Sequence, residues 1–181
     1  MQPLVPIEVD EQTGIWTTDG LPMIYVPRHF FINNHQAVVN AVGREEYASH
    51  LYDAGYKSAY FWCENEAPRH NLSGMDVFHH YLNRLSQRGW GLIRLSEDDI
   101  GSGQLKVELQ HSVFVLQYQK EHGDAPIAEN QCFMFNGWLA GAADWVADNL
   151  GLDMKFSCEE TQCAAQGHDL CVFTVSQIAK D

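Results

Sequence analysis

The apolar positions of the chain change their spacing along its length. Residues 1–26 hold short runs rich in β-branched and aromatic residues, separated by turn residues, which predicts a strand meander. From 27 to 89 the apolar residues recur at the spacing of a helix, which predicts a helical part. We expect three helices there, over residues 27–43, 44–66 and 73–88.

Residues 90–181 alternate between strand-like and helix-like spacing. Strands are predicted at 90–95, 104–118, 152–160 and 170–176, and a long helix at about 126–150. Strands that are joined by short polar turns favour antiparallel pairing. The expected fold class is therefore α/β of the α+β type, an antiparallel sheet with helices packed on it. A chain of 181 residues without a linker or repeat is expected to form a single domain, residues 1–181.

The chain is strongly acidic, with 24 Asp and Glu against 11 Lys and Arg and a formal net charge of -13. No basic stripe interrupts this charge, so a phosphate backbone would be repelled and nucleic acid is not expected as a partner. No run approaches the roughly 20 apolar residues of a membrane helix, and residues 1–10 lack the features of a signal peptide. These observations predict a cytoplasmic protein that does not contact a membrane.

The five cysteines are an odd number, which argues against a disulfide framework and favours free thiols or a metal. If 152–176 is a strand, a loop and a returning strand, then Glu160, Cys163 and Cys171 converge on one point. Zinc accepts thiolates and carboxylates in a tetrahedron, so a fourth ligand is needed. On spacing alone, the alternative is two buried cysteines in a strand pair beside an exposed carboxylate.

These residues form part of a longer pattern. It runs Val107-x-Leu109-x2-Ser112, then Cys132-x4-Gly137-x3-Gly141, then Glu160-x2-Cys163-x3-Gly167-x3-Cys171-x-Phe173. The pattern resembles the 4-vinyl reductase domain family, which includes the input domains of phenol- and xylene-responsive bacterial transcription activators. The resemblance implies a fold like the ligand-binding domains of nitric-oxide signalling and Golgi transport.

The resemblance also implies a zinc ion held by Cys132, Glu160, Cys163 and Cys171. Four protein ligands leave no position for a catalytic water, so this zinc is expected to be structural. Cys158, two residues before Glu160 on the same strand face, is a second candidate for the place of the carboxylate. Cys63 is expected to be plain core.

An apolar effector pocket beside the zinc is the next implication of the resemblance. In the family it is lined by the last long helix, the strand before it and the third helix. Here these parts supply Phe135 and Trp138, Leu109 and His111, and His79. Core packing is the alternative for each of them, and His79 is expected on the apolar face of its helix. Leu109 stands where the phenol sensors carry a tryptophan, which argues against phenol itself as the ligand.

The function expected from this pattern is that of a stand-alone, zinc-containing small-molecule-binding protein, a sensor or an accessory. It would bind a small apolar or aromatic molecule and act through a separate effector protein. One alternative is an enzyme or enzyme accessory of the vinyl-reductase type, although no nucleotide-binding glycine loop is present. Nucleophilic catalysis by a cysteine and a histidine is another alternative, but no spacing in the sequence identifies such a pair. The last alternative is a dimerising assembly module. Small residues near Gly55 would support a homodimer in either a sensor or an assembly module.

Overall fold

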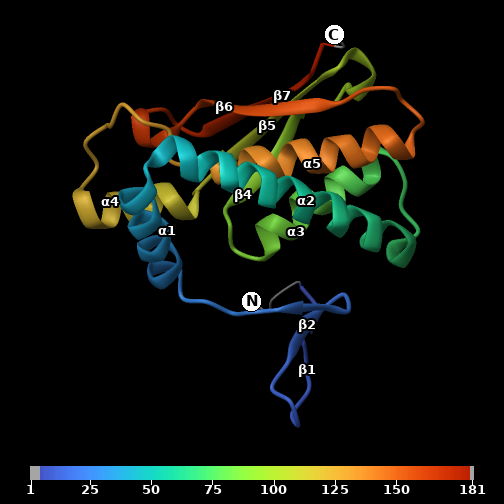
Figure 1. The fold of residues 1–181 in the computed structure, drawn as a ribbon, viewed down its shortest axis with the longest axis horizontal. Helices are drawn as coiled ribbons and strands as arrows, with labels where there is room; N and C mark the ends of the chain where they lie inside the picture. The colour runs from blue at the N-terminus through green and yellow to red at the C-terminus, as the bar shows by residue number, and fades with distance from the viewer. Residues whose placement is uncertain (1–4, 180–181) are drawn as a thin grey trace.

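The computed structural model describes residues 5–179, so residues 1–4 of the predicted meander lie outside the description. The meander is a small antiparallel sheet of β1 (Glu8–Val9), β2 (Trp16–Thr18) and β3 (Leu21–Met23), in the order β1-β2-β3. Figure 1 shows it projecting from the body of the molecule on the side away from the larger sheet. The predicted meander is therefore confirmed for the described residues.

Three helices follow the meander, as the apolar spacing predicts: α1 (Arg28–Val42), α2 (Arg44–His70) and α3 (Met75–Gln87). Helix α2 continues four residues beyond its predicted end at 66. It stops at Asn71, whose left-handed backbone (φ 53°) allows its N–H to meet the carbonyls of Ala67 and Pro68. The extra turn carries Glu66 and His70 toward the meander.

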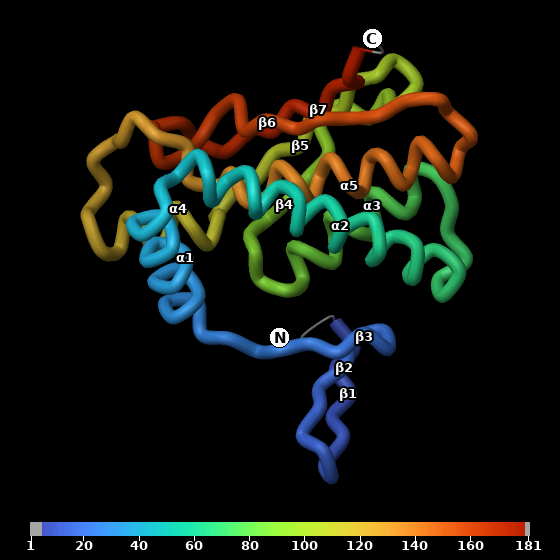
Figure 2. Tube along the Cα trace, in the orientation of Figure 1, coloured from blue at the N-terminus to red at the C-terminus, as the bar shows by residue number. Residues whose placement is uncertain are grey.

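The larger sheet has four strands, all paired antiparallel. In spatial order they are β4 (Leu92–Glu97), β5 (Gln104–Gln110), β7 (Cys171–Gln177) and β6 (Phe156–Gln162). The last long helix, α5 (Met134–Asn149), lies between the sheet and α2, and Figures 1 and 2 show the helices on one side of the sheet only. The predicted fold class is confirmed.

The core fills the space between the sheet and these helices. Its largest fully buried side chains include Phe78 of α3, Phe135 of α5, Phe156 of β6 and Phe173 of β7. Burial of such side chains is the main driving force for this fold. Within residues 5–179, none of the helices has both the length and the apolar character that a membrane crossing requires.

Two further predicted boundaries are wrong by about two helical turns. The strand predicted at 104–118 ends at Gln110, and a helix, α4 (Val113–His122), follows. His111 adopts a positive φ of 56°, and the Ser112 hydroxyl then accepts a hydrogen bond from the backbone N–H of Phe114 and caps the helix. The last helix begins at Met134 and not near 126, and backbone N–H groups of the preceding loop donate to the side chains of Cys163 and Glu160.

Helices α2 and α5 cross with backbone in contact. A Cβ atom added at Gly137 would collide with the carbonyl oxygen of Tyr52, and one at Gly141 with that of Tyr56. Gly55 faces the ring of Trp138, at 2.8 Å from its Cβ position to Cδ1. The small residues near Gly55 therefore admit α5 of the same chain, and a homodimer would need another surface.

Candidate metal centre

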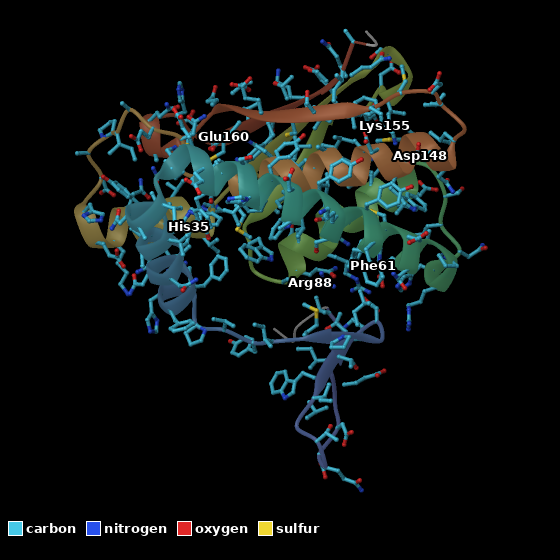
Figure 3. All side chains as sticks on the ribbon, in the orientation of Figure 1. His35, Phe61, Arg88, Asp148, Lys155 and Glu160 are labelled. Carbon is cyan, nitrogen blue, oxygen red and sulfur yellow. The ribbon has the colours of Figure 1, made fainter. Side chains whose placement is uncertain are left out.

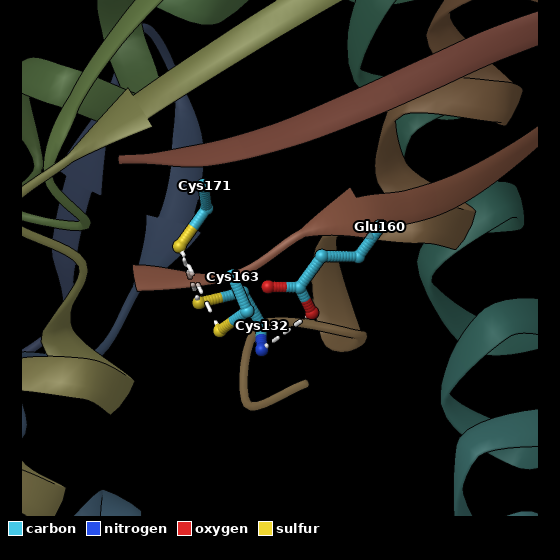
Figure 4. A group of neighbouring side chains, drawn as sticks. All are labelled: Cys132, Glu160, Cys163 and Cys171. Carbon is cyan, nitrogen blue, oxygen red and sulfur yellow. Dashed lines mark hydrogen bonds between the residues drawn. The ribbon is translucent and has the colours of Figure 1, made fainter. Parts of the chain in front are cut away.

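Four donor side chains from separate parts of the chain converge beside the sheet (Figure 4). Cys132 precedes α5, Glu160 lies on β6, Cys163 follows β6, and Cys171 begins β7. Their ligand atoms all lie within 4.8 Å of one another, and no side chain of the four is more than 2% exposed. The convergence of Glu160, Cys163 and Cys171 that the sequence predicts is thus present, with Cys132 as the fourth member.

The loop between β6 and β7 places two of the cysteines. A short 3-10 helix, η2 (Ala164–Gln166), ends at Gly167, whose φ of 92° reverses the chain at a place where few other residues fit. The Gln166 side chain accepts a hydrogen bond from the N–H of Cys163 at 3.3 Å and donates one to the carbonyl of Ala128 at 2.9 Å. The loop is thereby joined to the segment that carries Cys132.

The sulfur spacing fits a tetrahedral ion. The Sγ atom of Cys171 lies 3.5 Å from that of Cys132 and 3.9 Å from that of Cys163. Two sulfurs bound at about 2.3 Å to one tetrahedral zinc stand about 3.8 Å apart. A disulfide would require about 2.05 Å, and all three cysteines are free thiols.

Backbone N–H groups point at two of the sulfurs. The N–H of Gln131 donates to Cys163 Sγ, and the N–H of Ala164 donates to Cys171 Sγ, both at 3.3 Å. Such bonds favour the thiolate form and fix the direction of the sulfur, as outer ligand shells do at metal sites. The hydrogen bond with Cys132 and the N–H of Ala164 lower the pKa of Cys171, but Cys163 and burial outweigh them and raise it.

One oxygen of Glu160 has no partner. Its Oε2 accepts a hydrogen bond from the N–H of Cys132 at 2.8 Å, whereas the buried Oε1 has no hydrogen-bond partner within residues 5–179. Figure 4 shows the carboxylate turned toward the three cysteine side chains. A buried carboxylate oxygen without a partner is costly unless a cation balances it, so the donor set fits a metal ion.

The acid–base properties of three of these groups also fit a bound cation. Burial raises the pKa of Glu160 to about 9 and, with the neighbouring sulfurs, raises the pKa of Cys132 well above its usual range. Hydrogen bonds from Cys132 and Cys171 lower the pKa of Cys163 to about 2. The protein alone thus favours only some of the anionic donors, and a bound cation is what stabilises all of them together.

The two remaining cysteines lie outside this group. Cys158 is buried on the same face of β6 as Glu160, yet it is not among the gathered donors. Cys63 is fully buried within α2, as expected for core. Burial raises the pKa of both thiols, and neither belongs to the group of gathered donors.

The predicted pocket residues divide into buried and exposed ones. Leu109 and Phe135 are each 1% exposed, and the Trp138 ring meets that of Phe135 edge to face at 5.4 Å. His111 is exposed at the end of β5. His79 is also exposed, so its expected place on the apolar face of α3 is wrong by one residue: it is His80 that turns inward.

Three further rings join Phe135 and Trp138, and sequence reasoning did not assign them to the pocket. We call the five rings the aromatic cluster, which consists of Phe31, Trp90, Phe114, Phe135 and Trp138. Neighbouring rings lie 4.9–6.4 Å apart, several of them edge to face. They come from α1, from α4, from α5 and from the turn that precedes β4. Because these segments are far apart in sequence, the sequence does not reveal that the rings lie together.

The aromatic cluster adjoins the donor group. Ser112, which caps the helix of Phe114, has its hydroxyl 3.0 Å from Cys132 Sγ. Phe173, two residues after Cys171, has its ring 5.8 Å from that of Phe135. Leu109 pairs with Cys171 across β5 and β7. Two surface hollows, of about 750 and 330 Å³, are lined by other residues than the five predicted for the pocket.

Solved structures share this fold. The phenol-responsive sensory domain of the transcription activator PoxR, with phenol, matches with a TM-score of 0.77 at 13% identity, over 94% of this chain and 84% of the other. A vinyl-4-reductase family protein from Methanocaldococcus jannaschii matches at 0.56 and 16% identity, over 87% and 85%. Trafficking protein particle complex subunit 3 from Naegleria fowleri, covalently bound to palmitic acid, matches at 0.55 and 11% identity, over 84% and 95%. The resemblance predicted from sequence is confirmed for the fold.

The family is shown by sequence. Residues 1–96 match the family described as Domain of unknown function (DUF5943), and because this is more than half of the chain, the protein belongs to that family. No curated protein matches the chain. The matched segment contains the meander and helices α1 to α3, whereas all four donors of the metal centre follow it.

Proposed function

We propose that the protein is a single small-molecule-binding domain in which a structural zinc supports an apolar pocket. The observation that carries the proposal is the buried group of three sulfurs and one carboxylate, with all ligand atoms within 4.8 Å. Thiolates select soft metals such as zinc over magnesium or calcium. Cys132, Glu160, Cys163 and Cys171 would hold the ion, and no coordination position would be left for a reacting water.

The ion would add a further link among three pieces of backbone that hydrogen bonds already connect. These are the loop before α5, the end of β6 and the beginning of β7. Two of these pieces lead to rings near the aromatic cluster: the loop before α5 leads into Phe135, and β7 carries Cys171 and Phe173. A fixed metal centre would therefore set the position of these two rings.

The aromatic cluster is the proposed ligand site, with Leu109, Phe135 and Trp138 as its predicted members. Phenol in one matching structure and palmitic acid in another support an apolar or aromatic ligand for this fold. Edge-to-face rings leave faces on which a small planar or aliphatic molecule can insert. His79 and His111 are exposed and are left out of the proposed contacts.

The output is proposed to pass to a separate effector protein in the cytoplasm, from a homodimer that uses a surface other than the Gly55 crossing. The strong acidity of the chain, a formal net charge of -13, supports a protein partner over nucleic acid. We favour a sensor or accessory over an enzyme because the four-donor set leaves the ion no open position.

Substitution of one donor tests the metal centre. Cys163→Ser should remove one equivalent of zinc per chain and lower the melting temperature by about 10 °C, since the ion stabilises only the folded state. Zinc is measured by elemental analysis of protein purified without chelator, and melting by circular dichroism. Cys158→Ser, a buried cysteine on the same hairpin, is the control and should keep its zinc. Loss of zinc with unchanged melting would show that the ion is not structural.

Substitution of one ring tests the pocket. Trp138→Leu should weaken the binding of phenol, or of a medium-chain fatty acid, by about tenfold, because the contact area of one indole is removed. Binding is measured by calorimetry, and zinc content should stay unchanged. Trp145→Phe, on the same helix but outside the aromatic cluster, should bind normally. If neither compound binds wild-type protein at millimolar concentration, the proposed ligand class is wrong.

A further inference from the structure

A second group of metal-binding side chains lies at the other end of α2. Glu66 and His70 stand one turn apart on α2, His80 faces them from α3, and Asp19 approaches from the turn between β2 and β3. The ligand atoms of Glu66, His70 and His80 all lie within 4.8 Å of one another. Arg44 at the start of α2 meets the loop of the metal centre, and Glu66 follows it by about 33 Å of helix.

The distances in this group fit ligands around one ion. Glu66 Oε2 lies 3.1 Å from Nε2 of His80 and 3.2 Å from Nε2 of His70. Nitrogen and oxygen atoms bound at about 2.0–2.1 Å to a tetrahedral zinc stand about 3.4 Å apart. Asp19 Oδ1 lies 3.7 Å from His70 Nε2, so a second carboxylate lies beside the group, although it is not within 4.8 Å of all three ligand atoms.

Several atoms of the group are buried without partners. Glu66 is fully buried, and its Oε1 has no hydrogen-bond partner within residues 5–179. The Nε2 atom of His70 is likewise buried and makes no hydrogen bond of good geometry within that range, although Glu66 is close. An imidazole nitrogen that faces a carboxylate oxygen without donating to it is suited to a shared cation.

An ion-pair network without metal is the competing explanation. Arg84 lies 3.2 and 3.1 Å from the two oxygens of Asp19 and balances its charge. The guanidinium of Arg88 lies over the Trp62 ring at 5.5 Å, and Figure 3 places Arg88 on the side of the body that faces the meander, well apart from Glu160. Neither arginine gives Glu66 Oε1 a partner.

The histidine on α3 is fixed in an orientation that faces the other donors. His80 stacks on the Trp62 ring at 5.4 Å between centroids, which fixes its plane. Its Nε2 lies 3.1 Å from Glu66 Oε2, and an imidazole nitrogen in this position can coordinate a metal ion.

We propose that Glu66, His70, His80 and Asp19 bind a second divalent transition-metal ion of the zinc class, through nitrogen and oxygen donors only. This ion fastens the meander to α2 and α3, because Asp19 is the ligand that the meander supplies. The turn is shaped for this contact: Asp19 has a positive φ of 52°, and Gly20 faces the side chain of Arg69. All four ligands lie within the segment matched by the family, residues 1–96.

Zinc counting on protein saturated with zinc and then desalted tests the site. Wild type should hold two equivalents per chain, and His80→Asn and Cys163→Ser one each. His79→Asn, the exposed neighbour on α3, is the matched control and should hold two. If His80→Asn binds as much zinc as wild type, the proposal is wrong. Should His80→Asn fail to fold by circular dichroism, His70→Asn gives the same readout.

Cobalt distinguishes the two sites and keeps the two proposals separate. Cobalt in Cys163→Ser should show only the weak visible absorption of nitrogen and oxygen ligands, whereas His80→Asn should keep the strong thiolate charge-transfer absorption. Metal lost in His80→Asn but not in Cys163→Ser would support the second site and contradict the cysteine centre. No metal-dependent absorption in Cys163→Ser would overturn the second site. Limited proteolysis at residues 11–14 should become faster when the second ion is absent.

Discussion

His35 is a buried titratable residue at the junction of α1, α2, α4 and the loop before α5. It is 6% exposed, and its ring lies 5.0–5.2 Å from those of Tyr47, Phe114 and Phe133. Burial, together with the charge of Arg44, lowers its pKa to about 4. The folded protein therefore keeps this imidazole neutral at pH values where the unfolded chain protonates it.

The stability of the protein should consequently depend on pH through His35. The unfolded chain binds more protons than the folded one between pH 6.5 and about 4, so stability falls as the pH is lowered through this window. We expect the free energy of unfolding of wild type to drop by about 2 kcal/mol more than that of His35→Phe between pH 7 and pH 4.5. Urea unfolding of both proteins at both pH values measures this free energy.

Comparing wild type with His35→Phe cancels the contribution that the candidate metal ligands make to the pH dependence of stability, because both proteins contain them. His29→Gln, at an exposed position on the same helix, is the control and should follow wild type. Equal pH dependence in wild type and His35→Phe would show that His35 is protonated in the folded state as easily as in the unfolded chain.

At the level of single residues, the sequence predicts which side chains can bind a metal better than it predicts which way a side chain points. Glu160, Cys163 and Cys171 are recognisable because their spacing spans one hairpin, and the hairpin register then brings them together. His79 and His80 are adjacent, so an error of one residue in the phase of α3 exchanges an exposed imidazole for an inward one. Only the packing of Val77, Phe78 and Tyr81 decides that phase.

Among the elements, the crossing of α2 and α5 makes the sharpest prediction. Gly137→Ala should destabilise the protein by about 3 kcal/mol, because the new methyl group meets the rigid carbonyl of Tyr52. Gly55→Ala should cost less, since the atom nearest its added methyl group belongs to the side chain of Trp138. Chemical unfolding measures both.

The sign of the stability change caused by Gly137→Ala is informative. In an unconstrained helix, alanine is favoured over glycine by about 1 kcal/mol. A Gly137→Ala protein as stable as wild type would therefore mean that the two helices separate readily, and that the close crossing contributes little to the fold.

The elements that sequence patterns misplace share a cause. The run Val113–Leu116 is apolar at every position, so its spacing is equally compatible with a strand and with a buried helix. The decision comes from Ser112 as a cap and from His111 at positive φ, which are local features of one turn. The segment 124–133 has proline and helix-like spacing, yet its backbone N–H groups serve Cys163 and Glu160 instead.

For the molecule as a whole, layer order and donor set were predictable, and the groupings of distant side chains were not. Cys132 joins the other donors only through the family pattern, because 28 residues separate it from Glu160. The aromatic cluster and the group around Glu66 gather from segments far apart in sequence. Only Glu66 and His70 on α2, and Phe135 and Trp138 on α5, are at helical spacing; the other members become neighbours through tertiary packing alone.

The order of the elements along the chain has a consequence for biosynthesis. Helix α2 leaves the ribosome well before α5, whose glycines lie against it, and Cys171 emerges after both. The apolar surface of α2 is thus uncovered for much of translation. With the structural role proposed for zinc, chains made in a cell short of zinc would be less stable and more often exposed to chaperones and proteases, and less protein would accumulate.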